Sequence, residues 1–573
     1  MKTVTGLKYL WKLADIDEAL VYEHATTYNL AIPLVHTMVS RGLTTRGQID
    51  QFLFSHYEDM IPHSSLLKGA IEAVERIERA IKHKEKILIC GDYDVDGVTG
   101  SALFMLCLVQ LGAQVNFFLP HRVHDGYGLS IATVRRAAES GYTIIITVDN
   151  GITSYDAVCE ANKLGIEVII TDHHQPHAQL PPAAIIVNPH QPGCMYPSKV
   201  LAGVGVAFKV IVLLYERAGQ KVPEKVYELL LLGTIADVVP LTGENRYWVR
   251  YALRQVNSQE PLFLKKLKKN ARFAKQVLKA IDIGFFITPQ INALGRLSDA
   301  RKAVSFLLGS DVQDIEQVGD MLRELNESRK SIEKDVLTDI EGRIASGQID
   351  IAGERVICAG SCDWQPGVIG LVASRLAMIH QRPVLLYHET EAGIAKGSCR
   401  SIPGCDIVRA LRAHQDLLIS CGGHDMAAGF SLSVENLPEF KKRIEEYMRR
   451  EIPEVDIRPV LNLDAPVKLG DMQIKFMRDM AYLEPFGQGN PQPSFYVHNV
   501  TVLDKPVLLK EAHVKCLVFA DGVIKPVIFF QRPDLYGPLC EAHEKTVSLA
   551  AHVTENEWNG RVSIELQGID IAL

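Results

Sequence analysis

Five short motifs in one half of the chain are rich in side chains that bind metal ions. The motifs are GDYDVDG at 91–97, TVDNG at 147–151, TDHH at 171–174, VNP at 187–189 and IADVVPL at 235–241. Each follows an apolar run of β-strand composition, and a parallel sheet gathers its ligands at the carboxyl ends of its strands. Carboxylates with a few imidazoles suit manganese or magnesium better than zinc. The motifs therefore predict a metal-dependent phosphoester hydrolase.

Each acidic residue also has a purely structural interpretation. An Asp after a strand is commonly a helix N-cap or a turn former, so Asp149 alone does not indicate a metal. The alternating carboxylates of Asp92, Asp94 and Asp96 are harder to explain, because they would repel one another unless a cation or a proton lay among them. Taken together, the motifs favour a metal site over a series of unrelated caps.

Four apolar, β-branched runs must position these motifs. They are KILIC at 86–90, TIIITV at 143–148, EVIIT at 167–171 and AIIV at 184–187, and runs of this kind are typical of strands buried on both faces. Helices are predicted between them at 98–111, 130–139 and 154–164, where Gly112, Gly141 and Gly165 follow as C-terminal caps. The alternation predicts an α/β fold with a doubly wound parallel sheet.

The motifs resemble those of the DHH phosphoesterase superfamily, named for the triplet Asp172-His173-His174. Within it the chain is similar to the RecJ family of bacterial exonucleases specific for single-stranded DNA. The resemblance covers nearly the whole chain, and many short matches in the same order are specific where a lone triplet is not. Further matches are PHRVHDGYGL at 120–129, LAGVGVAFK at 201–209, INALGRL at 291–297, LRELNESRK at 322–330, WQPGVIGLVASRL at 364–376, KGSCRSI at 396–402, GGHDMAAGF at 422–430 and LEPFGQGNPQP at 483–493.

The resemblance implies a site for two Mn²⁺ or Mg²⁺ ions, and the sequence leaves the choice between the two metals open. The family's metal positions fall on Asp92, Asp94, Asp96, Asp149, His173 and Asp237. Asp149 is expected to bridge the ions and His174 to donate to the reacting phosphate. Two divalent ions can acidify a shared water and clamp both oxygens of an in-line displacement. Cys90 stands where more distant relatives carry a metal-binding His, so Asp92 must complete that side; the individual assignments among Asp92, Asp94 and Asp96 stay open.

The resemblance also implies a set of substrate-binding residues, most of them in the second half of the chain. Arginine forks and glycine N–H groups suit phosphate oxygens. In the family, the matching positions hold the strand and its 5′ phosphate, although any one arginine has a surface ion pair as its alternative. The residues are Arg122, Tyr127, Asn292, Arg296, Ser398, Arg400, Ser401, Gly423 and His424.

Five regions are expected along the chain. They are a helical lead-in at 1–75 that packs on the first lobe, a DHH catalytic domain at 76–309, a connector helix at 310–346, a second α/β DHH-associated domain at 347–452 and an OB-like β-barrel at 453–573. The connector has one apolar stripe with charged flanks, which predicts a rigid spacer. In the barrel, Phe529, Phe530 and Trp558 are candidates for stacking on bases, with burial in the core as the alternative.

Composition limits the choice of function and holds one contrary observation. The net charge is −7 with a pI near 6.3, whereas a nucleic-acid binder usually needs a positive surface. Acidic charge gathered at the metal site would reconcile the two. A basic cluster at 265–279 either flanks the DNA or is a solvated helix face. The 11 cysteines form no CxxC pair, which argues against structural zinc and favours a reducing cytoplasm.

We expect a cytoplasmic 5′-to-3′ exonuclease that hydrolyses single-stranded DNA to 5′-mononucleotides in DNA repair and recombination. The alternatives are a DHH phosphoesterase acting on oligoribonucleotides or cyclic dinucleotides, and a non-catalytic binding protein with a degenerate DHH fold. A monomer without membrane segments is expected, since no apolar run reaches the roughly 18 residues of a membrane helix. A single-strand-binding protein and a RecQ-type helicase are partners that the family implies.

Overall fold

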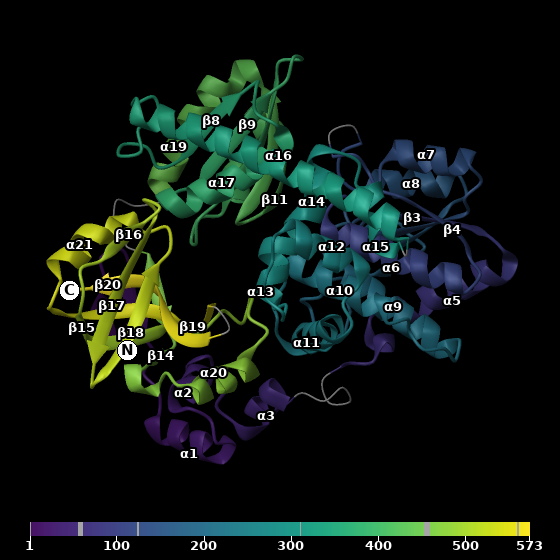
Figure 1. Cartoon of the computed structure of the whole chain (residues 1–573). Coiled ribbons are helices and arrows are strands. Elements are labelled where there is room, and N and C mark those ends of the chain that lie inside the picture. Colours follow the sequence, from purple (N-terminus) through teal and green to yellow (C-terminus); the bar gives the residue numbers. More distant parts are fainter. Residues whose placement is uncertain (1, 55–60, 123–124, 310, 452–458, 559–560) are drawn as a thin grey trace. The chain divides into compact units, whose positions relative to one another are not determined.

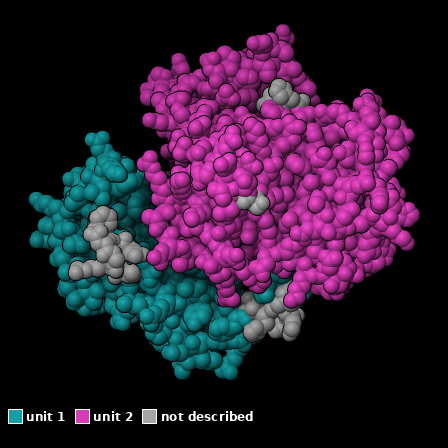
Figure 2. Space-filling model, turned by 45° about the vertical axis from the view of Figure 1, so that its right-hand side comes forward, with its two compact units in different colours: residues 1–61, 240–250, 456–573 teal, residues 62–239, 251–455 magenta. Residues whose placement is uncertain are grey.

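The structure is a computed structural model that describes residues 2–54, 61–122, 125–309, 311–451, 459–558 and 561–573 (Figure 1). The chain forms two compact units (Figure 2). One contains residues 62–239 and 251–455, and the other combines residues 1–61, 240–250 and 456–573. The predicted boundary between the second α/β domain and the barrel, at residues 452–453, lies outside the described residues.

A five-stranded parallel sheet forms the first half of the larger unit, with the strand order β4-β3-β5-β6-β7. Its strands are β3 (Lys86–Cys90), β4 (Gln114–Phe118), β5 (Ile144–Val148), β6 (Glu167–Thr171) and β7 (Ile185–Val187). Helices α7 (Ile131–Glu139) and α8 (Tyr155–Lys163) pack on one face of the sheet. Helices α6 (Val95–Gln110) and α9 (Gly203–Arg217) pack on the other, so the predicted doubly wound fold is confirmed.

Several further helices complete this half and lead into the connector. They are α5 (Ala70–His83), α10 (Lys225–Ala236), α12 (Leu262–Asn270), α13 (Ala280–Asp282), α14 (Thr288–Leu297), α15 (Arg301–Leu308) and α16 (Val312–Ala345). Helix α11 (Gly243–Ser258) is divided between the units, because its residues up to Arg250 belong to the smaller one. The connector α16 has 34 residues, which corresponds to a length of about 50 Å. Its first half packs on α12 and α14 and its second half on α17 (Pro366–His380). The predicted stripe is partly confirmed, because Leu322, Val336 and Ile340 are buried.

A second five-stranded sheet follows, in the order β11-β12-β10-β9-β8. Its strands are β8 (Ile357–Ser361), β9 (Val384–Glu389), β10 (Ile394–Arg400), β11 (Leu418–His424) and β12 (Ala427–Ser433). Helices α16 and α17 cover one face. Helices α18 (Ile407–Arg412) and α19 (Leu437–Glu451) cover the other. The second α/β domain of the sequence prediction is therefore present.

The smaller unit contains a barrel-like sheet. Its strands and helices are β13 (Val460–Leu463), β14 (Ala465–Pro466), α20 (Ile474–Met480), β15 (Phe495–Val502), β16 (Val507–Leu509), β17 (His513–Ala520), β18 (Val523–Phe529), α21 (Tyr536–Glu541), β19 (Thr546–Trp558) and β20 (Arg561–Ala572). Pairings run from β15 through β19, β20, β18 and β17 back to β15, as an OB-like barrel requires. Phe529 is fully buried in the core, so its proposed stacking role is wrong, whereas Phe530 is 47% exposed.

The N-terminal segment belongs to this smaller unit. It contains β1 (Lys2–Thr5), β2 (Leu10–Leu13), α1 (Glu18–Tyr28), α2 (Ile32–Ser40) and α3 (Arg46–Phe54). Strand β2 pairs with β13, and the buried Trp11 Nε1 donates to Asp570 at 3.0 Å. Leu34 is part of the barrel's core. The expectation that this segment packs on the first lobe is therefore wrong for β1, β2 and α2. The end of α3 does contact residues of the predicted catalytic region, since Arg246 and Arg250 of α11 donate to Phe52 O, and α5 packs on α9 and β7.

Candidate metal centre and phosphate cavity

The metal-binding motifs meet at the carboxyl edge of the parallel sheet. Asp92 follows β3 after Gly91, and Asp94 caps α6 by accepting hydrogen bonds from the backbone N–H groups of Asp96 (3.0 Å) and Gly97 (3.2 Å). Asp149 follows β5 with a positive φ of 62°, a backbone conformation that is costly for a residue other than glycine. Such strain persists where the surroundings fix the residue, as they do at many active sites.

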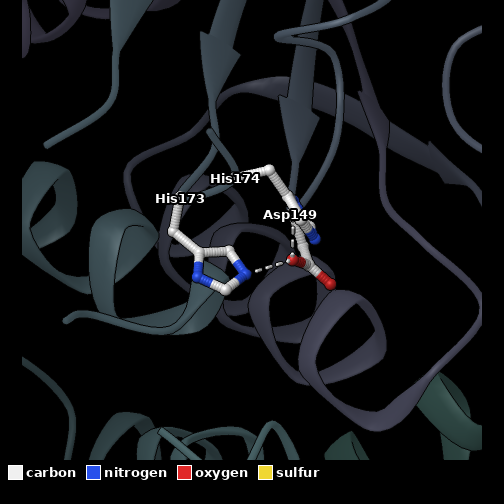
Figure 3. A group of neighbouring side chains, drawn as sticks. All are labelled: Asp149, His173 and His174. Atoms are coloured by element: carbon white, nitrogen blue, oxygen red, sulfur yellow. Dashed lines mark ion pairs between the residues drawn. The ribbon is translucent and has the colours of Figure 1, made fainter. Parts of the chain in front are cut away.

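Three groups of side chains each bring ligand atoms within 4.8 Å of one another. The groups are Asp92 with Asp94 and Asp149, Asp96 with His173 and Asp237, and Asp149 with His173 and His174. His173 Nε2 lies 3.1 Å from Asp149 Oδ1 and 3.6 Å from Asp237 Oδ2. Figure 3 shows Asp149 and the two histidines converging. Asp149 belongs to two of the three groups, the one with Asp92 and Asp94 and the one with the two histidines.

The donor set fits divalent cations because its polar atoms lack other partners. Among the described residues, Asp92 Oδ1, Asp149 Oδ1, His173 Nε2 and Asp237 Oδ2 are buried without a hydrogen bond. Burial, and then the charges of Asp96 and Asp94, raise the pKa of Asp149 well above its usual range. Burial and the charge of His174 lower the pKa of His173 to about 4, so this imidazole is neutral, the form that binds metals. An oxygen-rich site of this kind suits Mn²⁺ or Mg²⁺.

Two ligand positions are built by helix ends rather than by strands. Asp237 is the C-terminal cap of α10, so the prediction that its motif follows a strand is wrong. The apolar run before Asp237 is a buried helix, which apolar composition alone does not distinguish from a buried strand. Asp96 accepts hydrogen bonds from the first N–H groups of α9, Gly203 N at 2.6 Å and Val204 N at 2.8 Å. These bonds and the helix dipole hold the carboxylate in place.

Asp172, to which the sequence analysis assigned no role, orients the second histidine. Its Oδ1 lies 2.7 Å from His174 Nδ1 and also accepts the N–H groups of His173 and His174. Burial opposes protonation of His174, but the hydrogen bond and the charge of Asp172 raise its pKa to about 9. His174 is thus fixed as a donor beside the metal ligands. The position of Asp172 in the DHH triplet was the available sequence signal.

Two predicted substrate residues lie next to the metal centre. The Tyr127 hydroxyl donates to the backbone oxygen of Asp149 at 3.2 Å, and its ring is 6.2 Å from that of His174. Asn292 Oδ1 accepts the backbone N–H of Val95 at 3.1 Å, so this amide supports the first turn of α6. Asn292 therefore has a structural role in the GDYDVDG loop.

Four other predicted residues line one cavity of about 460 Å³. Arg122, Arg296, Ser398 and Arg400 contribute to it together with the N-terminus of α17 and strands β9, β10 and β12. Arg122 lies 4.0 Å over the ring of Tyr93, and Arg296 donates to Gly367 O at 2.9 Å. Burial, and then the charges of Arg122 and Arg329, lower the pKa of Arg296 to about 10. The described residues of the lining include four cationic side chains, the fourth being Lys396, and no carboxylate.

The remaining predicted residues do not line this cavity. Ser401 is buried and its hydroxyl donates to Cys405 O at 2.6 Å, so it stabilises the turn after β10. Gly423 has a φ of 136°, and an added Cβ would lie 2.4 Å from Ala427 O. The close packing of strands β11 and β12 in their hairpin therefore accounts for a glycine at this position. His424 is exposed at the end of β11. In the basic cluster at 265–279, Lys266 pairs with Glu316 and Asp320 and Lys275 with Asp282, as expected for a structural helix face.

Three parts of the chain match described protein families. Residues 86–234 match the DHH family, N-terminal domain, residues 353–450 the DHHA1 domain, and residues 463–570 the RecJ OB domain. These matches coincide with the two α/β sheets and the barrel.

Full-length relatives and solved structures agree with these matches. The chain is 34% identical to the single-stranded-DNA-specific exonuclease RecJ of Bacillus subtilis over 99% of this chain and 71% of the relative. The identity to the RecJ of Escherichia coli is 32%, over 93% of this chain and 95% of the relative. The crystal structure of Thermus thermophilus RecJ with Mn²⁺ aligns with a TM-score of 0.84 and 30% identity, over 98% of this chain and 79% of that chain. The chain therefore belongs to the RecJ family of the DHH phosphoesterases.

Proposed function

We propose that the protein is a 5′-to-3′ exonuclease that hydrolyses single-stranded DNA to 5′-mononucleotides. The observation that carries the proposal is the pairing of a buried carboxylate–histidine centre with a cationic cavity in the same unit. In an acidic protein of net charge −7, a cavity without carboxylates is a local site for phosphates. Figure 2 shows the unit that contains both features.

The side chains of the site have three separate roles in this reaction. Mn²⁺ or Mg²⁺, held by Asp92, Asp94, Asp96, Asp149, His173 and Asp237, would supply an acidified water and charge stabilisation at the scissile phosphate. His174, oriented by Asp172, donates a hydrogen bond to that phosphate. Arg122, Arg296 and Arg400 bind the phosphate at the 5′ end, with Ser398 held against Arg400 at 3.0 Å. The distance between the bound 5′ phosphate and the metal ligands then determines that one nucleotide is released in each reaction.

The wider biological setting follows from family membership and is part of the proposal. We place the protein in DNA repair and recombination in the cytoplasm, as a monomer that works with a single-strand-binding protein and a RecQ-type helicase. None of the helices among the described residues is long and apolar enough to cross a membrane.

Digestion of strands labelled at either end tests this function. Single-stranded DNA and RNA, with a 5′ or a 3′ label, are incubated with Mn²⁺, with Mg²⁺ or with a chelator. We expect a 5′ label on DNA to appear first as a mononucleotide, only with metal present. Earlier release of the 3′ label would contradict the polarity, and preferred cleavage of oligoribonucleotides or cyclic dinucleotides would favour another DHH phosphoesterase activity. Binding without cleavage would indicate a binding protein.

A further inference from the structure

The cationic cavity continues beyond its arginines along strand β10. Lys396, Ser398 and Arg400 are alternate residues of this strand and lie on the same face, at steps of about 6.7 Å. All three line the cavity. Arg400 Nη1 approaches Ser398 Oγ at 3.0 Å, so the guanidinium and the hydroxyl form one anion-binding position. Lys396 lies one further step along the strand and forms a separate position.

His388 lies beside Lys396 on the neighbouring strand. The register pairs Lys396 with His388 on β9, and both residues line the cavity. Nδ1 of His388 is buried and has no hydrogen-bond partner among the described residues. The side chain of Lys396 is exposed and forms no ion pair or hydrogen bond with the part of the chain that the structure describes. This end of the cavity therefore offers a ligand the Lys396 ammonium and the His388 imidazole, and the described lining residues include no carboxylate that would neutralise them.

The two ends of the cavity differ in their distance from the metal centre. Arg122 packs on Tyr93, which stands between the metal-site residues Asp92 and Asp94. Arg122 and Arg296 thus form the end nearest the metals. Lys396 is four residues along β10 from Arg400, which corresponds to about 13 Å. A 5′ phosphate bound by the arginines would leave the lysine end free for groups attached beyond it.

We propose that Lys396 and His388 form a subsite for additional 5′ phosphates, so that the enzyme accepts strands ending in a 5′-triphosphate. The proposal rests on the proposed exonuclease function and adds a class of substrate end to it. A terminal monophosphate would use only the arginine end. A triphosphate would extend its outer phosphates along β10 towards Lys396, where an ammonium and an imidazole can donate to them.

The test compares three versions of one oligodeoxynucleotide, ending in a 5′-hydroxyl, a 5′-monophosphate or a 5′-triphosphate. For the unaltered protein we expect kcat/KM with the triphosphate to equal or exceed that with the monophosphate. Lys396→Ala should lower kcat/KM for the triphosphate about 10-fold or more, and change the other two less than about 2-fold. Lys396→Arg should retain the activity. Lys442→Ala, at an exposed position of α19, is the control for a lost surface charge.

Each outcome bears on the subsite. An unaltered protein that discriminates against the triphosphate, or a Lys396→Ala protein with equal losses on all three ends, would overturn it. His388→Ala gives a second test, since its loss should also be confined to the triphosphate. If the unaltered protein releases no 5′ mononucleotide even from the monophosphate strand, the exonuclease function itself fails, and this result is distinct from the others.

Discussion

At the scale of single residues, Asp149 is the candidate metal ligand with the largest expected effect, because it belongs to two of the three ligand groups. It shares one group with Asp92 and Asp94 and another with His173 and His174. We expect Asp149→Asn to lower kcat by at least about 100-fold at saturating Mn²⁺, because a bridging carboxylate is lost while asparagine still tolerates the positive φ. Metal content and kcat are the measurements. Asp156→Asn, an exposed carboxylate of α8, should leave both unchanged; near-normal turnover in Asp149→Asn would exclude the bridging role.

The pKa values of the carboxylates predict how metal affinity depends on pH. Burial and the charge of Asp94 raise the pKa of Asp96 to about 7, and burial and the charge of Asp96 raise that of Asp237 to about 9. A raised carboxylate pKa stabilises the metal-free protein at low pH, and this contribution is lost as the pH rises through the folded-state value. Bound cations must displace these protons.

We therefore expect the affinity for Mn²⁺ to increase steadily from about pH 6 to pH 8.5, with net release of protons on binding. Titration calorimetry in two buffers of different ionisation enthalpy measures both quantities. The gain in thermal stability on adding Mn²⁺ should likewise grow with pH. An affinity that is independent of pH would show that the carboxylates are already ionised in the metal-free protein.

At the scale of elements, the start of α9 approaches the end of β5 so closely that only glycine fits. A Cβ on Gly203 would lie 2.5 Å from the Cβ of Asp149, whereas one on Gly205 would come no nearer than 3.4 Å to Leu201. We expect Gly203→Ala to reduce metal binding and kcat by about 10-fold or more, because it displaces Asp149 and the N–H that binds Asp96. Gly205→Ala is the matched control. Equal behaviour of the two variants would show that the contact can relax.

The strands of the parallel sheet show which elements can be predicted from sequence patterns alone. Strands β3, β5, β6 and β7 were predictable because buried parallel strands are continuously apolar. Strand β4 was missed, since QVNFF is a partly exposed edge strand without that signal. The family resemblance supplied six candidate metal positions, and the structure brings them together in groups that could hold a metal ion. The structural role of Asn292 could not be predicted, because its hydrogen bond to the Val95 N–H, 197 residues away, leaves no local pattern.

At the scale of the whole molecule, the smaller unit is assembled from three separate stretches of chain. Its N-terminal part depends on contacts more than 400 residues away, such as the hydrogen bond from Ala31 N to Asp479 and the ion pair of Arg41 with Asp464 at 2.8 Å. No local periodicity reports contacts of this range, so the sequence analysis did not place β1, β2 and α2 against the barrel.

This assembly changes what truncation should do. Removing residues 456–573 alone would expose Trp11 and Leu34, which are buried against that segment. We expect such a protein to aggregate, whereas removal of both 1–61 and 456–573 should leave a folded enzyme. The protein that lacks both segments should retain kcat but have a higher and more salt-sensitive KM, because the barrel contributes to binding of the DNA strand. Size-exclusion chromatography and kinetics on long strands test this, and equal solubility of both truncated proteins would contradict it.

The pairing of chain ends in the smaller unit also has a consequence for biosynthesis. Trp11 and its partner Asp570 are 559 residues apart. At about 5–20 residues per second, a ribosome needs roughly 30–110 s to supply the partner after the tryptophan has been made. During that interval the larger unit can fold as it emerges, while the edge of β2 that pairs with β13 has no partner. Nascent chains of this protein should therefore be bound by chaperones through their first segment, and released only once translation is nearly finished.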